Sequence, residues 1–178
     1  ILLAILAILF SFTYPIQASQ MSLISGFTIG IPGFLLALEK NRARIEGDFV
    51  ETVIEQALPA ALTNLISVLF LVVLGHFLGL SQGEISTISI YLLALIGFTK
   101  VYQLSLPFNH VKLGIILLNV AGFSLSVFVF SSIFNLSQLH LTSWILTLVL
   151  GLVMEGVLWL MNRLVYTLVT HRHKSRIK

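Results

Sequence analysis

Charged residues are so few in this chain that their positions constrain its fold more than any other feature. The ten Lys and Arg and the seven Asp and Glu leave uncharged runs at residues 1–38, 56–83, 85–99 and 113–154. A helix that spans a bilayer needs about 20 mostly apolar residues, so the longest of these runs can hold two spans each. The chain is therefore predicted to be an all-α, polytopic transmembrane helical bundle. Its 10% of charged residues excludes an ordinary soluble domain, in which about 25% is usual.

Prolines and polar turns divide the runs into about six membrane segments, the first of them partial, within a single transmembrane domain covering residues 1–178. We expect the segments at about 1–14, 19–38, 57–78, 87–106, 111–130 and 141–165. A cytoplasmic amphipathic connector at 39–56 and a cytoplasmic basic tail at 166–178 lie outside them. Because the chain opens inside an apolar run, we expect it to be a fragment or a processed piece of a longer protein.

The basic residues indicate which side of the membrane each turn faces. If the connector at 39–56 is cytoplasmic, alternation places all ten Lys and Arg at or near the cytoplasmic face, as the positive-inside rule requires. The chain is thus predicted to be a multi-pass cell-membrane protein with a cytoplasmic C-terminus. Its net charge of +3 then reflects sidedness, so the expected partner is the lipid bilayer and not a nucleic acid. The absence of cysteine excludes disulfides and thiolate metal sites within the chain.

The connector at 39–56 is predicted to include an interfacial helix, because Ile45, Phe49 and Val53 form an apolar stripe at a spacing of four. One interpretation is a linker that lies on the membrane surface. The other is a lever that contacts a cytoplasmic domain. The pattern of residues leaves both open.

The segment at 19–38 differs from the others because it carries glycines and a proline inside the membrane. Pro32 removes one backbone hydrogen bond, and glycines beside it lower the cost of unwinding. We therefore predict a broken helix whose helix-break residues are Gly26, Gly30, Pro32 and Gly33. At membrane depth such a break is tolerated where the freed carbonyls line a cavity or bind a cation.

Two hydroxyl-bearing residues of this segment, Ser25 and Thr28, are three positions apart and can face one side of the helix. Together with the backbone of Ile29 they make a candidate metal site of oxygen ligands for a hard cation. The alternative is close helix packing, since Gly26 and Gly30 form a small-xxx-small pair. The span by itself leaves both interpretations open.

Glu155 is the one acidic residue well inside a predicted span. A charge at the centre of a span costs about 2.5–3.5 kcal/mol on insertion scales, so this carboxylate is a second candidate metal or proton site. Two structural alternatives stand beside it. Glu155 can pair with a polar group on a neighbouring segment, such as Asn119 or Asn64, or lie at a shallow interfacial position.

The segment at 19–38 also carries a family resemblance. The residues at 18–20 (Ala-Ser-Gln) and 28–32 (Thr-Ile-Gly-Ile-Pro) are similar to the P-x-Q and N-x-x-T-D-G-x-P pattern in the sixth membrane helix of cation-transporting P-type (E1-E2) ATPases. The chain resembles the end of the fifth helix through the tenth, and residues 27–41 look similar to a bacterial, calcium-exporter-like branch. By position, the family's Asn ligand falls on Ser25, its Thr on Thr28 and its Asp on Ile29. The acidic ligand that calcium pumps use at that position is therefore absent.

The resemblance implies the membrane half of an ATP-driven cation pump that exports a cation, with calcium as the expected ion. The chain would contribute part of the ion path and the support helices. It carries no catalytic residue and no cofactor site, because the D-K-T-G-T phosphorylation motif and the T-G-E loop are absent, so ATP and Mg²⁺ would belong to the parent pump. The implied partners are the remaining helices and cytoplasmic domains of that pump and the transported cation. The alternatives are a standalone multi-pass membrane subunit or scaffold without transport chemistry, and a secondary transporter, for which a second broken helix is expected.

Overall fold

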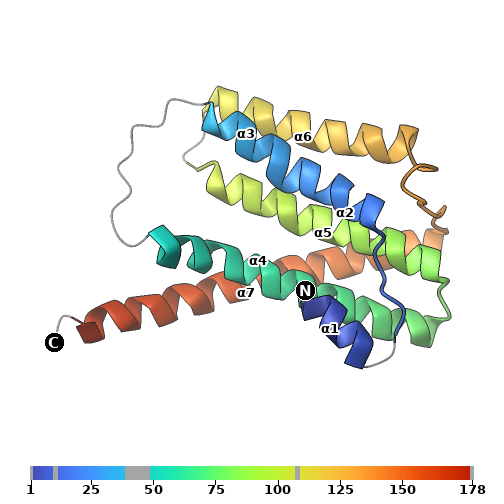
Figure 1. Cartoon of the computed structure of the whole chain (residues 1–178), viewed down its shortest axis with the longest axis horizontal. Coiled ribbons are helices and arrows are strands. Elements are labelled where there is room, and N and C mark those ends of the chain that lie inside the picture. The colour runs from blue at the N-terminus through green and yellow to red at the C-terminus, as the bar shows by residue number, and fades with distance from the viewer. Residues whose placement is uncertain (1, 10–11, 39–48, 107–108, 177–178) are drawn as a thin grey trace.

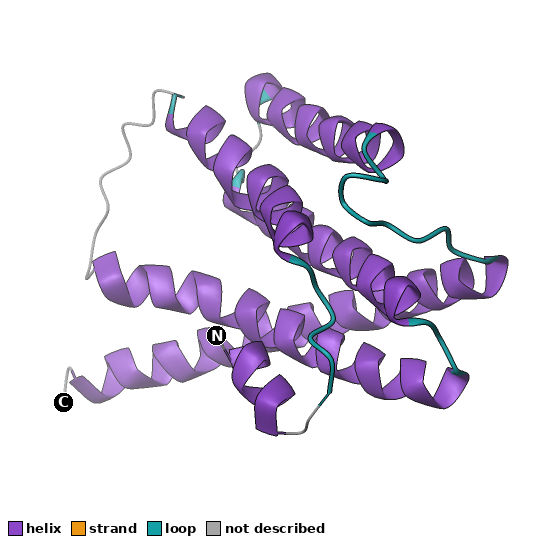
Figure 2. Cartoon of the chain, turned by 45° about the vertical axis from the view of Figure 1, so that its right-hand side comes forward, coloured by secondary structure: helices purple, strands orange, loops and turns teal. Residues whose placement is uncertain are grey.

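The computed structural model describes residues 2–9, 12–38, 49–106 and 109–176. Within these residues the chain is helical and contains no strand (Figure 1, Figure 2). The helices are α1 (Leu2–Leu9), α2 (Ala18–Ser25), η1 (Gly26–Gly30), α3 (Ile31–Ala37), α4 (Phe49–Leu78), α5 (Gln82–Leu104), α6 (His110–Val129) and α7 (Leu141–Arg176). The η1 segment is a π-helix that joins α2 directly to α3.

Among the described residues, five helical stretches are long and apolar enough to cross a membrane. They are Ala18–Ala37, Gln56–Leu78, Gln82–Leu104, His110–Val129 and Leu141–Val165. The predicted all-α bundle of membrane-length helices is thereby confirmed. The helix α1 has 8 residues. At about 1.5 Å per residue it is much shorter than the hydrocarbon core of a bilayer, which is about 30 Å thick.

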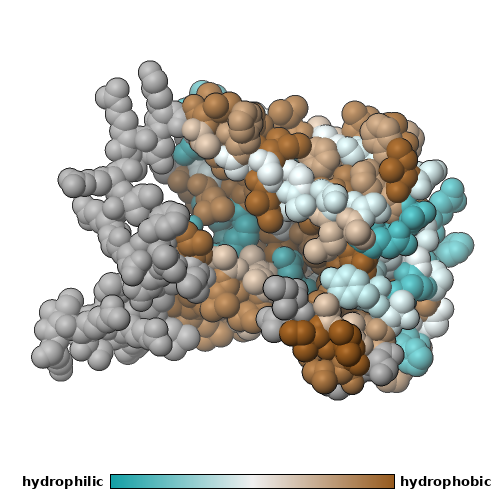
Figure 3. All heavy atoms as spheres, viewed as in Figure 1, coloured by the Kyte–Doolittle hydropathy of each residue, from teal (hydrophilic) through white to brown (hydrophobic). Residues whose placement is uncertain are grey.

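Successive spans run in opposite directions (Figure 1). The ends of α3, α5 and α7 lie with the starts of α4 and α6 at one end of the bundle, which we call the basic end because it carries Lys100, Lys112 and Arg163. The starts of α2, α5 and α7 lie at the opposite end. Figure 3 shows hydrophobic side chains over much of the visible face and hydrophilic ones gathered at this opposite end. The alternation brings the ends of consecutive spans together at the two ends of the bundle.

The helix α5 is the one around which the others pack. The helices α4 and α7 contact it, and so do α2, η1 and α6. In its most apolar window 61% of the residues are buried, against 17–28% in the other spans. Two apolar clusters mark its two sides, one of Leu23, Ile24, Ile90, Ala94 and Phe123 and the other of Leu71, Ile85, Ile88, Leu92 and Leu150. Small residues let helices approach closely in a membrane, and α5 supplies several of them, including Ser86, Ser89, Ala94 and Gly97.

Two helices extend past their membrane-spanning parts. The helix α4 begins at Phe49, so residues 49–56 of the expected connector are continuous with the span. The other part of the connector, residues 39–48, lies outside the described residues, as does Ile45 of its apolar stripe. The helix α7 continues to Arg176, so residues 166–176 of the expected basic tail are helical.

Candidate functional site

The predicted break in the second membrane segment is a π-helical turn and not an unwound stretch. The backbone N–H of Ile31 donates to the carbonyl of Gly26, five residues earlier, which is the hydrogen bond of a π-helix. Pro32 follows at the start of α3 and has no N–H to continue the α-helical ladder. The expected unwinding was therefore wrong. The helix stays continuous, because one π-helical turn accommodates the proline that lacks a backbone N–H. Such π-turns occur frequently at functional sites.

The hydroxyls of Ser25 and Thr28 both donate to carbonyls of their own helix. Ser25 Oγ lies 3.3 Å from the carbonyl oxygen of Ser22, and Thr28 Oγ1 lies 2.8 Å from that of Ile24. Each hydroxyl oxygen keeps lone pairs that can accept from a donor or bind a cation. Their surroundings differ, since Ser25 is exposed and Thr28 is half-buried against α5.

One side of this span faces away from the other described helices. The side chain of Ile29 is 71% exposed. A Cβ atom added at Gly26 or Gly33 would meet no atom within 4 Å, and one at Gly30 would meet only the carbonyl oxygen of Ser25 at 3.7 Å. Within the described residues, the small-xxx-small pair of Gly26 and Gly30 thus receives no neighbouring helix.

Close packing does occur at η1, but the glycines lie on the partner helices. A Cβ atom at Gly97 of α5 would lie 2.5 Å from Cγ2 of Thr28. A Cβ atom at Gly122 of α6 would lie 2.7 Å from Cε1 of Phe27. The π-helical turn therefore inserts Phe27 and Thr28 into two glycine gaps, which holds this turn against α5 and α6. Sequence reasoning missed both glycines, because Gly97 and Gly122 stand alone in otherwise ordinary spans.

Glu155 lies between α7 and α5, where Thr99 Oγ1 donates to its Oε1 at 2.7 Å. Thr99 is thus the partner, and not Asn119, whose Nδ2 donates to the carbonyl of Ile115, nor Asn64. Gly97, which lies against Thr28, and Thr99 are two residues apart on α5, so they face directions about 200° apart around the helix axis. The structure therefore places Glu155 on the far side of α5 from Thr28 and does not bring it to Ser25 or Ile29.

The contact of Glu155 with Thr99 belongs to a polar seam between α5 and α7 near the basic end. Lys100 Nζ donates to Asn162 Oδ1 at 2.7 Å, and Asn162 Nδ2 donates to Gln103 Oε1 at 3.3 Å. Among the described residues there is no group of three or more His, Cys, Asp or Glu side chains that would hold a metal ion. In this seam, polar side chains of α5 and α7 hydrogen-bond to each other, which is how polar residues inside a bilayer are stabilised.

Gln20 makes a third buried polar contact, at the opposite end of the bundle. Its side chain is fully buried. Its Oε1 accepts from Ser86 Oγ at 2.6 Å and from the backbone N–H of Gln17 at 2.9 Å, and its Nε2 donates to the carbonyl of Phe134 at 3.0 Å. Gln20 thereby ties the start of α2 to α5 and to the segment before α7. An amide side chain at the entrance of an apolar span is the signal that predicts such a contact.

The fold and these contacts define a multi-pass helical membrane protein in which one described span contains a π-helical turn. Over 110 residues the chain is 37% identical to "Probable cation-transporting ATPase exp7" of Streptococcus pneumoniae serotype 4 (strain ATCC BAA-334 / TIGR4). The matched part is 62% of this chain and spans 14% of the length of that relative. No family model matches the chain, and no solved structure matches it.

Proposed function

We propose that this chain is the membrane part of an ATP-driven cation pump and that α2, η1 and α3 line part of the ion path. The observation that carries the proposal is the π-helical turn at Gly26–Gly30, in the middle of a membrane span. The similarity to a cation-transporting ATPase supports it. We place the basic end on the cytoplasmic side, where the positive-inside rule puts Lys and Arg.

The chemistry of this span suits a hard cation. The hydroxyl oxygens of Ser25 and Thr28 and the carbonyls around Ile29 are oxygen donors, which Ca²⁺ prefers. We propose calcium as the ion and export as the direction, from the resemblance of residues 27–41 to calcium exporters. Calcium takes about 6–8 oxygen ligands, several of them carboxylates, so the remaining ligands would come from other helices of the pump. ATP and Mg²⁺ would act on its cytoplasmic domains.

Glu155 enters this proposal as a contact between helices and not as an ion ligand. Its carboxylate accepts from Thr99 on the face of α5 that is turned away from Thr28. Replacement of Glu155 by Gln keeps an oxygen that accepts from Thr99. An E155Q pump should therefore keep its dependence on the cation.

The test is Thr28→Val in the full-length pump. Valine keeps the methyl group that fills the gap at Gly97 but removes the hydroxyl oxygen. The matched control is Thr63→Val in α4, because Thr63 Oγ1 also donates one turn back, to the carbonyl of Pro59 at 2.8 Å, and is fully buried. We expect T28V to lower the apparent affinity in cation-stimulated ATP hydrolysis and T63V to leave it unchanged. Equal cation dependence of T28V and T63V would remove Thr28 from the ion path.

A further inference from the structure

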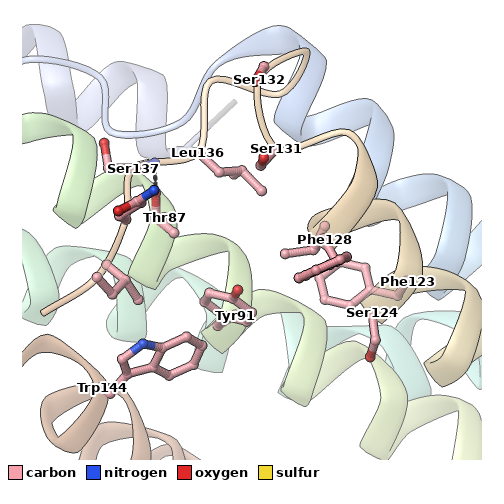
Figure 4. A pocket seen from close by; sticks show the side chains of 13 residues that line it. Thr87, Tyr91, Phe123, Ser124, Phe128, Ser131, Ser132, Leu136, Ser137 and Trp144 are labelled. Atoms are coloured by element: carbon pink, nitrogen blue, oxygen red, sulfur yellow. Dashed lines mark hydrogen bonds between the residues drawn. The ribbon is translucent and has the colours of Figure 1, made fainter. Parts of the chain in front are cut away.

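A cleft of about 870 Å³ lies at the opposite end of the bundle, between α6 and α7. Both helices pack on α5, but they are not among the helix pairs that contact each other extensively. The helix α5 therefore forms the floor of the cleft, α6 and α7 form its walls, and residues 131–139 close its end (Figure 4). Its size falls within the range of about 300–1,000 Å³ that is typical of ligand sites. We call it the α6–α7 cleft.

The lining of the α6–α7 cleft has an apolar part and a hydroxyl-rich part. Figure 4 shows the rings of Tyr91 and Trp144 on one side and those of Phe123 and Phe128 on the other, with Ser131 toward the closed end. The rings of Tyr91 and Trp144 lie 5.1 Å apart between centroids. Of the described residues that line the cleft, none is charged.

Several polar side chains of the cleft have no hydrogen-bond partner among the described residues, in contrast to Thr87, whose Oγ1 accepts from the backbone N–H of Ser137. The side chains of Ser131, Ser132 and Gln138, the hydroxyl of Tyr91 and the indole N–H of Trp144 make no hydrogen bond to other described residues. Ser131, Ser132 and Gln138 lie between the end of α6 and the start of α7, and Trp144 lies in the first turn of α7, at the level at which a span meets the membrane interface. Tyr91 lies further along the membrane span, on α5. Tyr and Trp are enriched at the interface because they have an apolar body and a polar tip.

The position of the cleft decides what fills it. Because α6 and α7 are both long and apolar enough to span a membrane, we expect lipid beside the gap between them, with acyl chains along its apolar part. The free hydroxyl, amide and indole groups suit a headgroup that both donates and accepts hydrogen bonds. The absence of a charged lining residue gives a phosphate no counter-charge.

We propose that the α6–α7 cleft binds one lipid with an uncharged, hydroxyl-bearing headgroup, of the glycolipid class. Its acyl chain lies against Phe123, Val127 and Phe128. Its sugar hydroxyls bond to Ser131 and its neighbours and stack near Trp144. The proposal requires only that the bundle spans a membrane, so it stands or fails independently of the proposed pump.

The test uses monoglucosyl diacylglycerol with a photoactivatable diazirine in one acyl chain, added to membranes that contain the complete protein. Mass spectrometry of peptides locates the crosslinks. We expect them to concentrate on residues 123–144 and around Tyr91. Unlabelled monoglucosyl diacylglycerol should compete at about threefold to tenfold lower concentration than phosphatidylglycerol. This ratio of affinities corresponds to the free energy of one or two hydrogen bonds.

Two variants separate the acyl chain from the headgroup. Val127→Phe fills the apolar part and should reduce crosslinking in the cleft severalfold. Its matched control is Val129→Phe, on an exposed face of α6 outside the cleft, which should leave crosslinking in the cleft unchanged. The triple variant S131A/S132A/Q138A changes only residues near the surface and should keep the crosslinks. In this variant, unlabelled monoglucosyl diacylglycerol and phosphatidylglycerol should compete at the same concentration.

Three outcomes overturn the proposal. Crosslinks spread evenly over all exposed helix faces show ordinary contact with the bilayer. Equal competition by phosphatidylglycerol in the unmodified protein removes the preference for an uncharged headgroup. An unlabelled cleft shows that a protein segment or a second copy of the chain fills it.

Discussion

The glycine gap at Gly97 predicts a sharp loss of stability when one methyl group is added. In Gly97→Ala the new Cβ would lie 2.5 Å from Thr28 Cγ2 and 2.7 Å from Thr28 Cβ. Carbon atoms pack comfortably at about 3.5–4.0 Å, so α5 and η1 must separate by about 1 Å. Thr28 cannot turn away, because it is β-branched and its hydroxyl is held by the carbonyl of Ile24. Overpacking of this kind costs about 1–3 kcal/mol.

The matched control is Gly156→Ala in α7, where an added Cβ meets no atom within 4 Å. Alanine gains about 1 kcal/mol over glycine in a helix in both variants, so the difference between them isolates the clash. Equilibrium unfolding in mixed micelles, followed by circular dichroism, should show G97A less stable than G156A by about 1–3 kcal/mol. The double variant G97A/T28G moves the glycine from α5 to η1 and should recover much of the loss. Equal stability of G97A and G156A would refute the close approach of η1 to α5.

Two further predictions concern the buried polar contacts and use the same unfolding measurement. Gln20→Ala removes three hydrogen bonds, each worth about 0.6 kcal/mol in membrane bundles. The free energy of unfolding of Q20A should therefore fall by about 2 kcal/mol. The control Gln82→Ala, at an exposed position, should change it little. A Q20A protein as stable as Q82A would contradict the contact. Thr99→Val removes the donor to Glu155 and should cost about 0.6–1.7 kcal/mol. That cost should vanish in an E155L background, and a cost that persists there would show that Thr99 acts through something other than Glu155.

The second membrane segment shows how far its residues alone predict a site. The helix departs from α geometry at Gly26–Gly30, directly before the turn that contains Pro32. The form of the departure depends on Gly97 and Gly122, which lie far away in sequence and receive Thr28 and Phe27. Because these neighbours hold the segment in place, one π-turn accommodates the missing N–H of Pro32. A local sequence pattern cannot predict that outcome.

The buried polar residues give a similar lesson. Glu155 stands out in the sequence as a carboxylate inside a span, but its partner, Thr99, lies on another helix 56 positions away. Gln20 attracts attention through its place in a motif, while its contacts to Ser86 and Phe134 arise only when α2, α5 and the segment before α7 meet. The sequence identifies which polar groups need partners, and packing selects the partners.

The sequence by itself determined that this chain is a bundle of membrane-length helices. That result is local, because within a bilayer each stretch must be long enough, apolar enough and hydrogen-bonded within itself. The tertiary structure decided that α5 is the central helix, that Glu155 and Thr28 lie on different sides of it, and that α6 and α7 leave a cleft between them. Those results depend on which helix faces meet, and in lipid the choice comes from small residues and polar contacts distributed over distant parts of the chain.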